Sequence, residues 1–260
     1  MKGLLYQKQL HYWDTIWMLA KTDLKMRYQG SWLGAVWVFL KPFCLFLILN
    51  FVFSNLFFKH NPHYTIRLLV GLVLWSFFSE ATTVGMNSLL DKAHILKKIY
   101  IPLWLIIISS TIHSALAFFF NLVILFIFLV AFNVFPGILQ LSAFTIYILL
   151  IYGISLTFSF FAAPLYVKFR DLNQIWEVLL SVLFYASPII YPITAVPPHV
   201  QTILYLNPMT LLIEHSKVAL IDHSIARFDH LLIFIAIFIP CFIGSIWYLK
   251  KSSKNLIERM

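Results

Sequence analysis

Long apolar runs separated by short polar segments dominate this sequence, and they leave few folds open to it. One run, from Pro102 to Phe132, exceeds the roughly 20 residues that a helix needs to cross a bilayer. A membrane barrel would instead show segments of about 10 residues with alternating polarity. Only 11% of the residues are charged, against about 25% in a typical soluble domain, so a water-soluble fold would lack polar surface. The sequence therefore predicts an integral membrane protein built from helices.

We expect an all-α integral membrane protein with six transmembrane helices in a single domain over residues 1–260. Each predicted helix follows one apolar run, and the first run is slightly short, so part of the segment before it must also be immersed. The predicted spans are Phe43 to Phe58, Leu68 to Leu90, Pro102 to Phe132, Leu141 to Val167, Ile175 to Tyr191 and Leu231 to Leu249.

The basic residues indicate which ends of these helices face the cytoplasm. Of the 19 Lys and Arg residues, 15 fall in segments that would lie inside and four in segments outside. This asymmetry is the positive-inside pattern, and it predicts that both termini are cytoplasmic. Because topology explains the net charge of +9, we do not expect nucleic acid as a partner. The N-terminal residues contain no uninterrupted apolar segment of the signal-peptide type.

The N-terminal segment over residues 11–30 has apolar residues at helical spacing, which predicts an amphipathic helix. Tryptophan suits the headgroup region and lysine suits an anionic leaflet, so we expect this helix to lie at the membrane interface. A helix packed on a soluble partner would show the same pattern. The apolar positions are Trp13, Ile16, Trp17, Ala20 and Leu24.

The segment over residues 192–229 differs from the rest because it combines several prolines with two short apolar pieces. These pieces, roughly Val200 to Leu206 and Met209 to Ile221, are too short to cross a bilayer. We predict two short helices, broken at Asn207 and Pro208, that dip into the outer leaflet as a re-entrant hairpin. Backbone of this kind persists at membrane depth only where protein or a water-filled cavity covers it.

Few side chains offer chemistry of their own. The sequence has no GxxxxGK[ST] phosphate loop, so ATP, if it drives this protein, must bind to another chain. Acids inside the membrane are candidates for proton coupling, and Glu80, Glu177 and Glu214 are available. His113 lies well inside a span and would be the candidate residue of a membrane-embedded acyltransferase, although a packing histidine is the commoner case. No ligand set at fixed spacing indicates a metal site.

Aromatic residues make up 18% of the chain, and most should form lipid-facing or interfacial belts. Flat rings also stack on the apolar faces of sugars, and a pore for a polymer benefits from contacts that are weak and repeated. Lipid or core packing is the alternative role for each ring. Because they lie beside polar or kinked positions, the candidate channel-lining aromatics are Trp75, Phe78, Tyr185 and Tyr191.

Five stretches of the sequence together resemble one family. TDLKMRYQGSWLGAVWVFLKP, at residues 22–42, resembles the N-terminal signature of ABC-type polysaccharide and polyol-phosphate export permeases. These are the membrane subunits that export O-antigen, capsule or teichoic-acid chains. Lys41 of this chain stands where many members have a neutral residue. The other similar stretches are ILKKIYIP at 95–102, FRDLNQI at 169–175, SPIIYP at 187–192 and LNPMTLLIE at 206–214.

The resemblance implies a transporter subunit, not an enzyme, in the bacterial cytoplasmic (inner) membrane. Two copies would pair, and two separate nucleotide-binding ATPase subunits would dock from the cytoplasm with ATP and Mg, so no cofactor is expected on this chain. The loop over residues 91–101 would be the coupling helix that sits in a cleft of the ATPase, with a second inner contact after the fourth span. The implied ATPase-coupling residues are Asp91, His94, Lys97, Lys98, Arg170 and Asp171.

The implied substrate is a long glycan or polyol-phosphate chain on a polyprenyl-pyrophosphate lipid. Lys25, Arg27 and Lys41 would receive the pyrophosphate through charge-assisted hydrogen bonds, although the positive-inside rule explains the same cations without a substrate. The outer hairpin over residues 192–229 would act as an extracellular gate. The implied gate residues are Asn207, Pro208 and Glu214.

Three other functions fit parts of the sequence. A small-molecule or drug exporter of the related ABC class would share the general pattern of spans. It would lack the motifs quoted above at the first span and at the outer hairpin. A membrane-embedded acyl- or glycosyltransferase would depend on His113 or on an acid in a loop. A proton-coupled carrier would depend on Glu80 or Glu177.

Overall fold

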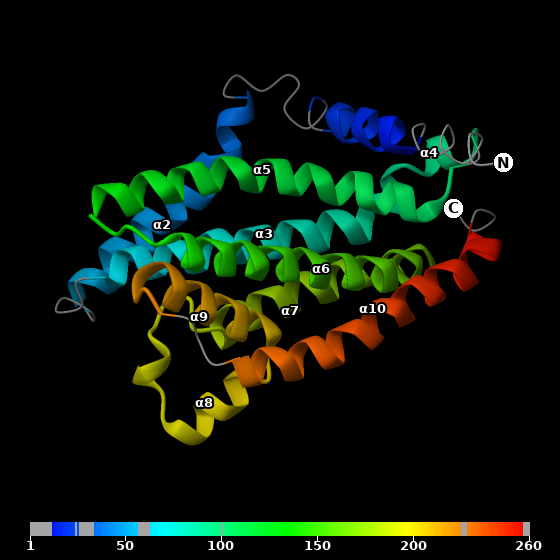
Figure 1. Cartoon of the computed structure of the whole chain (residues 1–260). Coiled ribbons are helices and arrows are strands. Elements are labelled where there is room, and N and C mark those ends of the chain that lie inside the picture. The colour runs from blue at the N-terminus through cyan, green and yellow to red at the C-terminus, as the bar shows by residue number, and fades with distance from the viewer. Residues whose placement is uncertain are drawn as a thin grey trace.

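The computed structural model of the chain describes residues 12–23, 25, 34–56, 63–99, 101–224 and 228–256. The regular structure of these residues is helical, and the long helices run side by side in one bundle (Figure 1). Residues 12–23 form a first helix, which we call the N-terminal helix. The remaining elements are η1 (Gly34–Val36), α2 (Trp37–Leu56), α3 (Tyr64–Asp91), α4 (Ala93–Leu96), α5 (Leu103–Ala131), α6 (Ile138–Lys168), α7 (Leu172–Ala186), η2 (Ile193–Ala195), α8 (Pro198–Leu204), α9 (Pro208–Ile221) and α10 (Phe228–Leu256).

Four helices in the described part of the chain are long and apolar enough to cross a membrane. They are α3, α5, α6 and the Leu231–Ser253 portion of α10. The 28 residues of α3 extend about 42 Å, more than the hydrocarbon core of a bilayer. The apolar portion of α2, Leu40–Ser54, and the 15-residue α7 are shorter. The all-helical membrane architecture is therefore confirmed, with four of the six predicted spans long enough on their own.

Helix α3 lies at the centre of the bundle, where it packs mainly against α5 and α6 and also contacts α2, α7 and α9. Helix α6 lies close to α3 at Gly85. A Cβ atom at this glycine would lie 2.0 Å from Ser159 Oγ, so only a residue without a side chain fits there. The buried residues of α3 are mostly apolar, and this helix contributes more residues than any other to the larger of two hydrophobic core clusters.

Helix α10 lies at the edge of the bundle, and its main contact is with α6. Its contact face includes Phe238, whose ring would be 2.8 Å from a Cβ atom at Gly153 of α6. The opposite face exposes large aliphatic side chains, among them Ile233, Ile239 and Ile243. Such a surface suits lipid because it has few polar groups to hydrate.

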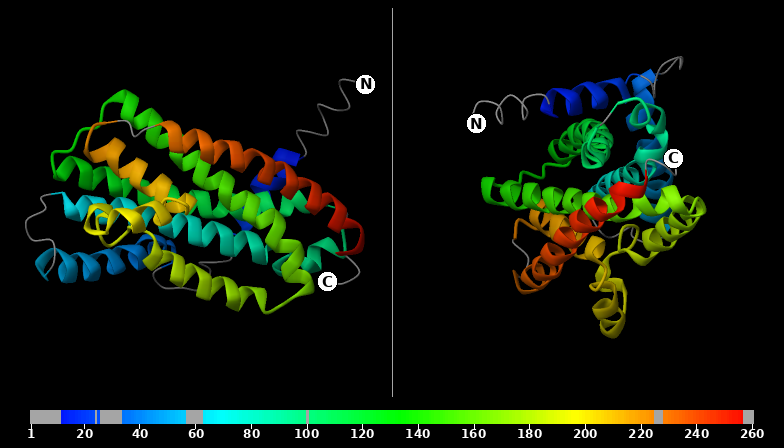
Figure 2. Two further views of the ribbon diagram at one scale, coloured as in Figure 1. Left: turned by 90° about the horizontal axis from the view of Figure 1, so that it is seen from below. Right: turned by 90° about the vertical axis from the view of Figure 1, so that its right-hand side faces the viewer.

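The N-terminal helix lies across α5, as the right-hand view of Figure 2 shows. It buries Ile16 and Ala20, and Tyr12 packs edge-on against Trp104 of α5 with 5.7 Å between ring centroids. Trp13 and Trp17, which the periodicity assigned to the same apolar face, are exposed. A helix is thus present over residues 12–23, as predicted, while its docked face is narrower than the predicted apolar face.

Two helix ends differ from their predicted positions, and each has a backbone reason. Within the predicted coupling segment over residues 91–101 the helix is the single turn of α4, which is separated from α3 because Lys92 leaves the α conformation (φ −103°, ψ 15°). Helix α7 ends at Ala186 instead of Tyr191, because Pro188 has no N–H group and forces an extended Ser187 before it.

The two ends of the bundle carry different elements. The N-terminal helix, α4 and the last turns of α10 lie at one end, and α8 and α9 lie toward the other (Figures 1 and 2). Helices α8 and α9 are separated at Asn207, whose side-chain oxygen accepts a hydrogen bond from the backbone N–H of Met209 at 3.0 Å. This bond caps α9, and Pro208 suits the first helical position because its missing N–H is not needed there.

Candidate functional site

The turn that follows α7 is held by side chains from two other helices. Tyr64 of α3 donates a hydrogen bond from its hydroxyl to the carbonyl of Ile190 at 2.8 Å. From α9, Asn207 Nδ2 donates to Ser187 Oγ at 3.0 Å, and Lys217 Nζ donates to the carbonyl of Pro188. We call these three bonds the outer latch. The bond from Asn207 to Ser187 joins the SPIIYP and LNPMTLLIE motifs, whose contact the sequence alone did not predict.

The charged pair under the outer latch is almost fully buried. Lys217 Nζ lies 2.8 Å from Glu214 Oε1, and the two side chains are 3% and 8% exposed. Removing one member of such a pair is strongly destabilising, since the other is then left as an uncompensated buried charge. Gly71 of α3 makes room for this cluster, because a Cβ atom there would lie 3.5 Å from Lys217 Cε and 3.2 Å from an Ile189 methyl carbon.

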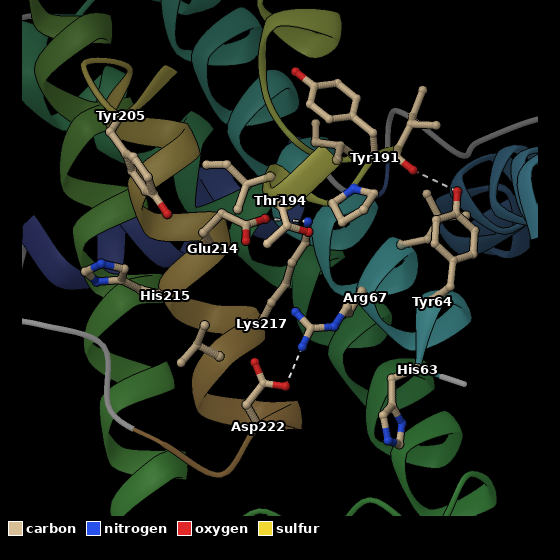
Figure 3. A pocket seen from close by; sticks show the side chains of 16 residues that line it. His63, Tyr64, Arg67, Tyr191, Thr194, Tyr205, Glu214, His215, Lys217 and Asp222 are labelled. Atoms are coloured by element: carbon tan, nitrogen blue, oxygen red, sulfur yellow. Dashed lines mark hydrogen bonds and ion pairs between the residues drawn. The ribbon is translucent and has the colours of Figure 1, made fainter. Parts of the chain in front are cut away.

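A cavity of about 520 Å³ opens beside the outer latch. Figure 3 shows that its charged side chains are arranged in two pairs, with Glu214 and Lys217 inside and Arg67 and Asp222 nearer the rim. Three tyrosines and a threonine supply hydroxyl groups around them. The polar residues that line the cavity include Tyr64, Arg67, Tyr191, Thr194, Tyr205 and Glu214.

Two of these tyrosines lie in the connection between α7 and α9. Burial raises the pKa of the Tyr205 phenol above its ordinary value, and the neighbouring Glu214 carboxylate raises it further. The same two causes, in the same order, raise the pKa of Tyr191. Both phenols therefore stay protonated at neutral pH, and the hydroxyl of Tyr191 donates to the carbonyl of Tyr185 at 3.2 Å.

One face of α3 is polar and is not fully covered by the rest of the described chain. From residue 76 to residue 87, each partly exposed position except Val84 carries a polar side chain. These positions recur at helical spacing of three or four residues, so they form one line along the helix. We call this line the polar stripe. Its members are Ser76, Ser79, Glu80, Thr83 and Asn87.

Lys41 of α2 faces the polar stripe across a groove of about 670 Å³ that includes Ser79 and Glu80. Glu80 is 12 residues from Lys92, which corresponds to about 18 Å along α3. Lys41 therefore lies beside the middle of α3, whereas Lys25 lies two residues after Asp23, which pairs with Lys92 at the end of α3. The structure does not bring these two predicted cations together, and Arg27 lies outside the described residues.

Helix α7 has a second uncovered polar face. It packs on α3 through Trp176, whose indole N–H donates to Thr82 Oγ1 at 3.2 Å. Only Trp176 and Leu180 of this helix are buried. The exposed polar side chains at helical spacing on its other side are Gln174, Glu177, Ser181 and Tyr185.

The predicted channel-lining aromatics divide into two pairs. Trp75 and Phe78 are 7% and 4% exposed and pack against each other, with 5.6 Å between ring centroids, inside an aromatic cluster. Tyr185 is 69% exposed and Tyr191 is half-buried. The first pair thus contributes mainly to the core of one chain, and Tyr185 is the most exposed of the four candidates.

The predicted ATPase-coupling residues gather at one end of the bundle. They occupy the α3–α4–α5 corner and the short connection between α6 and α7, and every one of these side chains is exposed. The cationic surface at this end includes Lys25, which is also exposed. The residues concerned are Asp91, His94, Lys97, Lys98, Arg170 and Asp171.

Lys92 at the same corner is buried and paired. Its ammonium lies 2.6 Å from Asp23 Oδ2 of the N-terminal helix, 2.9 Å from Ser110 Oγ and 3.2 Å from Ser109 Oγ. Sequence reasoning counted Lys92 as one of the inner cations and missed this role. A buried pair between residues 69 positions apart leaves no local signal in one sequence.

Lys217 was also missed, although a signal was present. The residue follows Glu214 by three positions within an apolar helix, and such a pair in an apolar segment indicates a buried ion pair. The polar stripe was detectable too, because its spacing along the predicted second span is helical. Only Glu80 of this stripe was selected from the sequence.

Comparison with known proteins identifies the family of the chain. The ABC-2 type transporter family matches residues 14–221. The O-antigen export system permease protein RfbA of Myxococcus xanthus is 26% identical over 221 residues, which cover 84% of this chain and 85% of that protein. Two proteins of the same name from Klebsiella pneumoniae are 27% and 28% identical over 204 residues, which cover 77% of each chain. Together with the helical membrane fold, this match shows that the chain belongs to the ABC-2 type transporter family.

Proposed function

We propose that this chain is the transmembrane subunit of an ATP-driven ABC exporter that moves a lipid-linked polysaccharide across the bacterial cytoplasmic membrane. The similarity to O-antigen export permeases supports the polysaccharide class. The polar stripe of α3 carries the proposal, because it gives a chain of otherwise apolar spans one surface suited to a hydroxyl-rich polymer. The chain acts as a permease, not as an enzyme.

The polar stripe cannot face lipid without a large cost. A carboxylate at the centre of a bilayer costs on the order of 2.5–3.5 kcal/mol on insertion scales, and each unpaired hydroxyl or amide costs about 1–3 kcal/mol more. A second copy of the chain facing α3 and α7 removes this cost by enclosing the two polar faces around a hydrated conduit. Tyr185 then provides a ring on the conduit wall, and Trp75 and Phe78 support that wall from behind.

Six spans complete the topology, with α2 and α7 crossing the membrane beside the four long helices. The cations of the α4 corner and the positive-inside rule support a cytoplasmic position for this end of the bundle and for both termini. The segment over residues 192–229 then lies at the outer surface as a re-entrant hairpin. The backbone of this hairpin is covered by helices α3 and α6, which pack against α9, and it borders the cavity described above.

Two separate ATPase subunits supply the energy, since this chain has no phosphate loop. They hold ATP and Mg, and they dock on the exposed corner with α4 as the coupling element. The basic residues available there are His94, Lys97 and Lys98, with Arg170 in the second contact. Closure of the ATPase pair is transmitted as a rigid-body shift of this corner.

The pyrophosphate of the polyprenyl carrier contacts cations at two depths in the membrane. Lys25 and Arg27 serve at the inner headgroups, and Lys41 serves beside the polar stripe, where Glu80 lines the same groove. At the outer end, Asn207, Pro208 and Glu214 belong to the gate. The outer latch supports this role, because its three bonds determine where the turn after α7 sits.

Depletion of the protein in its host tests the proposed function directly. We expect lipid-linked polysaccharide to accumulate in the inner leaflet and to disappear from the cell surface. Surface polysaccharide that is unchanged after depletion would contradict the proposal.

Thiol labelling tests the conduit. In a Cys44→Ser/Cys241→Ser background, we expect Ser79→Cys and Thr83→Cys on the polar stripe to react with a membrane-impermeant thiosulfonate. Ile239→Cys and Ile243→Cys on the exposed face of α10 are the matched controls and should stay unreactive, because lipid covers them. Equal reactivity on the two helices would overturn the assignment of the conduit to α3.

A further inference from the structure

The buried ammonium of Lys92 joins three parts of the chain. A lysine side chain has three N–H donors, and all three find oxygen acceptors here. Asp23 comes from the N-terminal helix, Ser109 and Ser110 come from α5, and Lys92 itself lies between α3 and α4. A single side chain therefore connects the membrane bundle, the coupling turn and the N-terminal helix.

Burial distinguishes this lysine from its neighbours in sequence. Lys92 is 6% exposed, whereas Lys97 and Lys98 point into solvent. An exposed lysine satisfies the positive-inside rule at little cost, but a buried one requires a compensating anion. Topology alone therefore accounts for Lys97 and Lys98 and leaves the position of Lys92 unexplained.

The N-terminal helix contributes the anion in the correct register. Ile16, Ala20 and Asp23 follow each other at spacings of four and three, so they lie on one face of the helix. Ile16 and Ala20 are 4% and 0% exposed, and Asp23 continues this docked face toward Lys92. The apolar contacts are not directional, whereas the ion pair joins one atom of each partner and so fixes the position of the helix on the bundle.

We propose that Lys92 is a positioning residue that, through Asp23, makes the N-terminal helix and the α4 corner one mechanical unit. A displacement applied at α4 then moves the N-terminal helix and the start of α5 together. The N-terminal helix becomes part of the surface that responds to the ATPase without needing its own contact. This inference rests on the proposed function only for the source of the displacement.

The accessibility of position 20 to a thiol reagent shows whether the Lys92–Asp23 pair holds the N-terminal helix on the bundle. An Ala20→Cys variant in the Cys44→Ser/Cys241→Ser background places a thiol under the docked helix, where maleimide reacts slowly. We expect Asp23→Asn and Lys92→Met to raise the labelling rate on the order of tenfold or more, since the helix then detaches more often. The matched controls are Asp14→Asn and Lys21→Met, which remove the same charges from exposed positions of the same helix and should change nothing.

Activity in proteoliposomes with the partner ATPase reports what the link does. We expect Asp23→Asn to retain ATP hydrolysis but to export several-fold less glycan per ATP, with Asp14→Asn as the control. Asp23→Asn is the milder of the two variants, because Lys92 keeps its two serine partners and the amide oxygen of asparagine can still accept a hydrogen bond.

Each outcome decides a separate statement. Unchanged labelling of Cys at position 20 would overturn the link itself. Increased labelling with unchanged export of glycan per ATP would show that the link exists but does not transmit the displacement of α4. A wild-type protein that exports no glycan would contradict the proposed function, and the labelling rates would still decide the link because they require no transport.

Discussion

Helices α3 and α10 are both long enough to cross a membrane, but they expose opposite kinds of surface. The apolar window of α3 has a mean hydropathy of 1.5 and is 72% buried, whereas that of α10 has a mean hydropathy of 2.3 and is 11% buried. The less apolar helix is thus the more buried one. In a water-soluble protein the opposite order would be expected.

The difference shows which medium each helix meets. Lipid is as apolar as a leucine side chain, so a span gains nothing by burying its apolar face and α10 can leave that face outside. The polar groups of α3 must be covered by protein or water, and the part that remains uncovered in one chain is the polar stripe. Four paired substitutions test this comparison, in order of decreasing effect on stability.

The largest effect is expected from a new charge on the exposed faces. Ile243→Lys on α10 should lower the amount of protein in the membrane, at a cost of about 2.5–3.5 kcal/mol, because a lysine would face lipid near the middle of the span. Val84→Lys, beside the polar stripe, should be tolerated, since Glu80 lies one turn earlier and a lysine four residues after a glutamate pairs favourably with it. Immunoblots of membrane fractions measure both. Equal losses would show that α3 faces lipid.

Glycine substitution tests the packing of the same two helices. Gly85→Ala should destabilise the protein by about 1–3 kcal/mol, because the new methyl group would overlap Ser159 of α6. Gly244→Ala on α10 should be neutral or stabilising by up to about 1 kcal/mol, since the nearest atom is a Phe161 ring carbon at 3.9 Å and alanine favours the helix. Thermal unfolding in detergent compares them, and a harmless Gly85→Ala would refute the close approach of α3 and α6.

Loss of a hydroxyl tests how each helix uses its polar side chains. Thr82→Val should cost about 1–2 kcal/mol, because the buried indole N–H of Trp176 loses its acceptor. Ser245→Ala on α10 should cost about 0.5 kcal/mol or less, since that hydroxyl bonds only within its own helix, to Phe242. A double-mutant cycle with Trp176→Phe isolates the interhelical bond. A coupling energy near zero would mean that α7 is held to α3 by apolar contacts alone.

The smallest effect on stability is expected within the polar stripe. Ser79→Leu should change the unfolding free energy by less than about 0.5 kcal/mol, because the site is partly exposed and tolerates the larger group. Export should nevertheless fall several-fold, since an apolar side chain interrupts the hydrated wall. Ile239→Leu on α10 is the control for both measurements. Full export by Ser79→Leu would show that the polar stripe does not line the conduit.

Sequence reasoning was accurate where the cause is local. Apolar runs predicted α3, α5 and α6 to within a few residues, whereas α10 continues seven residues beyond its apolar run. The prolines of the 192–229 segment correctly placed the break between α8 and α9. The end of α7 was predictable from Pro188 but was placed five residues late, because the apolar run continues through Tyr191. Hydropathy alone therefore overestimates a span that proline terminates.

The remaining features depend on contacts between distant residues. Asp23 and Lys92 looked like ordinary interfacial charges, and only the docking of the N-terminal helix makes them a pair. Trp75 and Phe78 were selected for their rings, but the helix rotation that packs them inward also turns Ser76 and Ser79 outward. Rotation of a span about its axis is set by its neighbours, so a list of apolar runs cannot supply it.

The outer latch has a consequence for biosynthesis. Helix α7 is short, carries a polar face and buries only Trp176 and Leu180, so it has little to hold it in a bilayer when it leaves the ribosome. The bonds that fasten its end come partly from Asn207 and Lys217, which are synthesised later. A nascent chain that stops before α9 therefore lacks these fasteners, and the protein acquires its fifth predicted span only when almost the whole chain has been made.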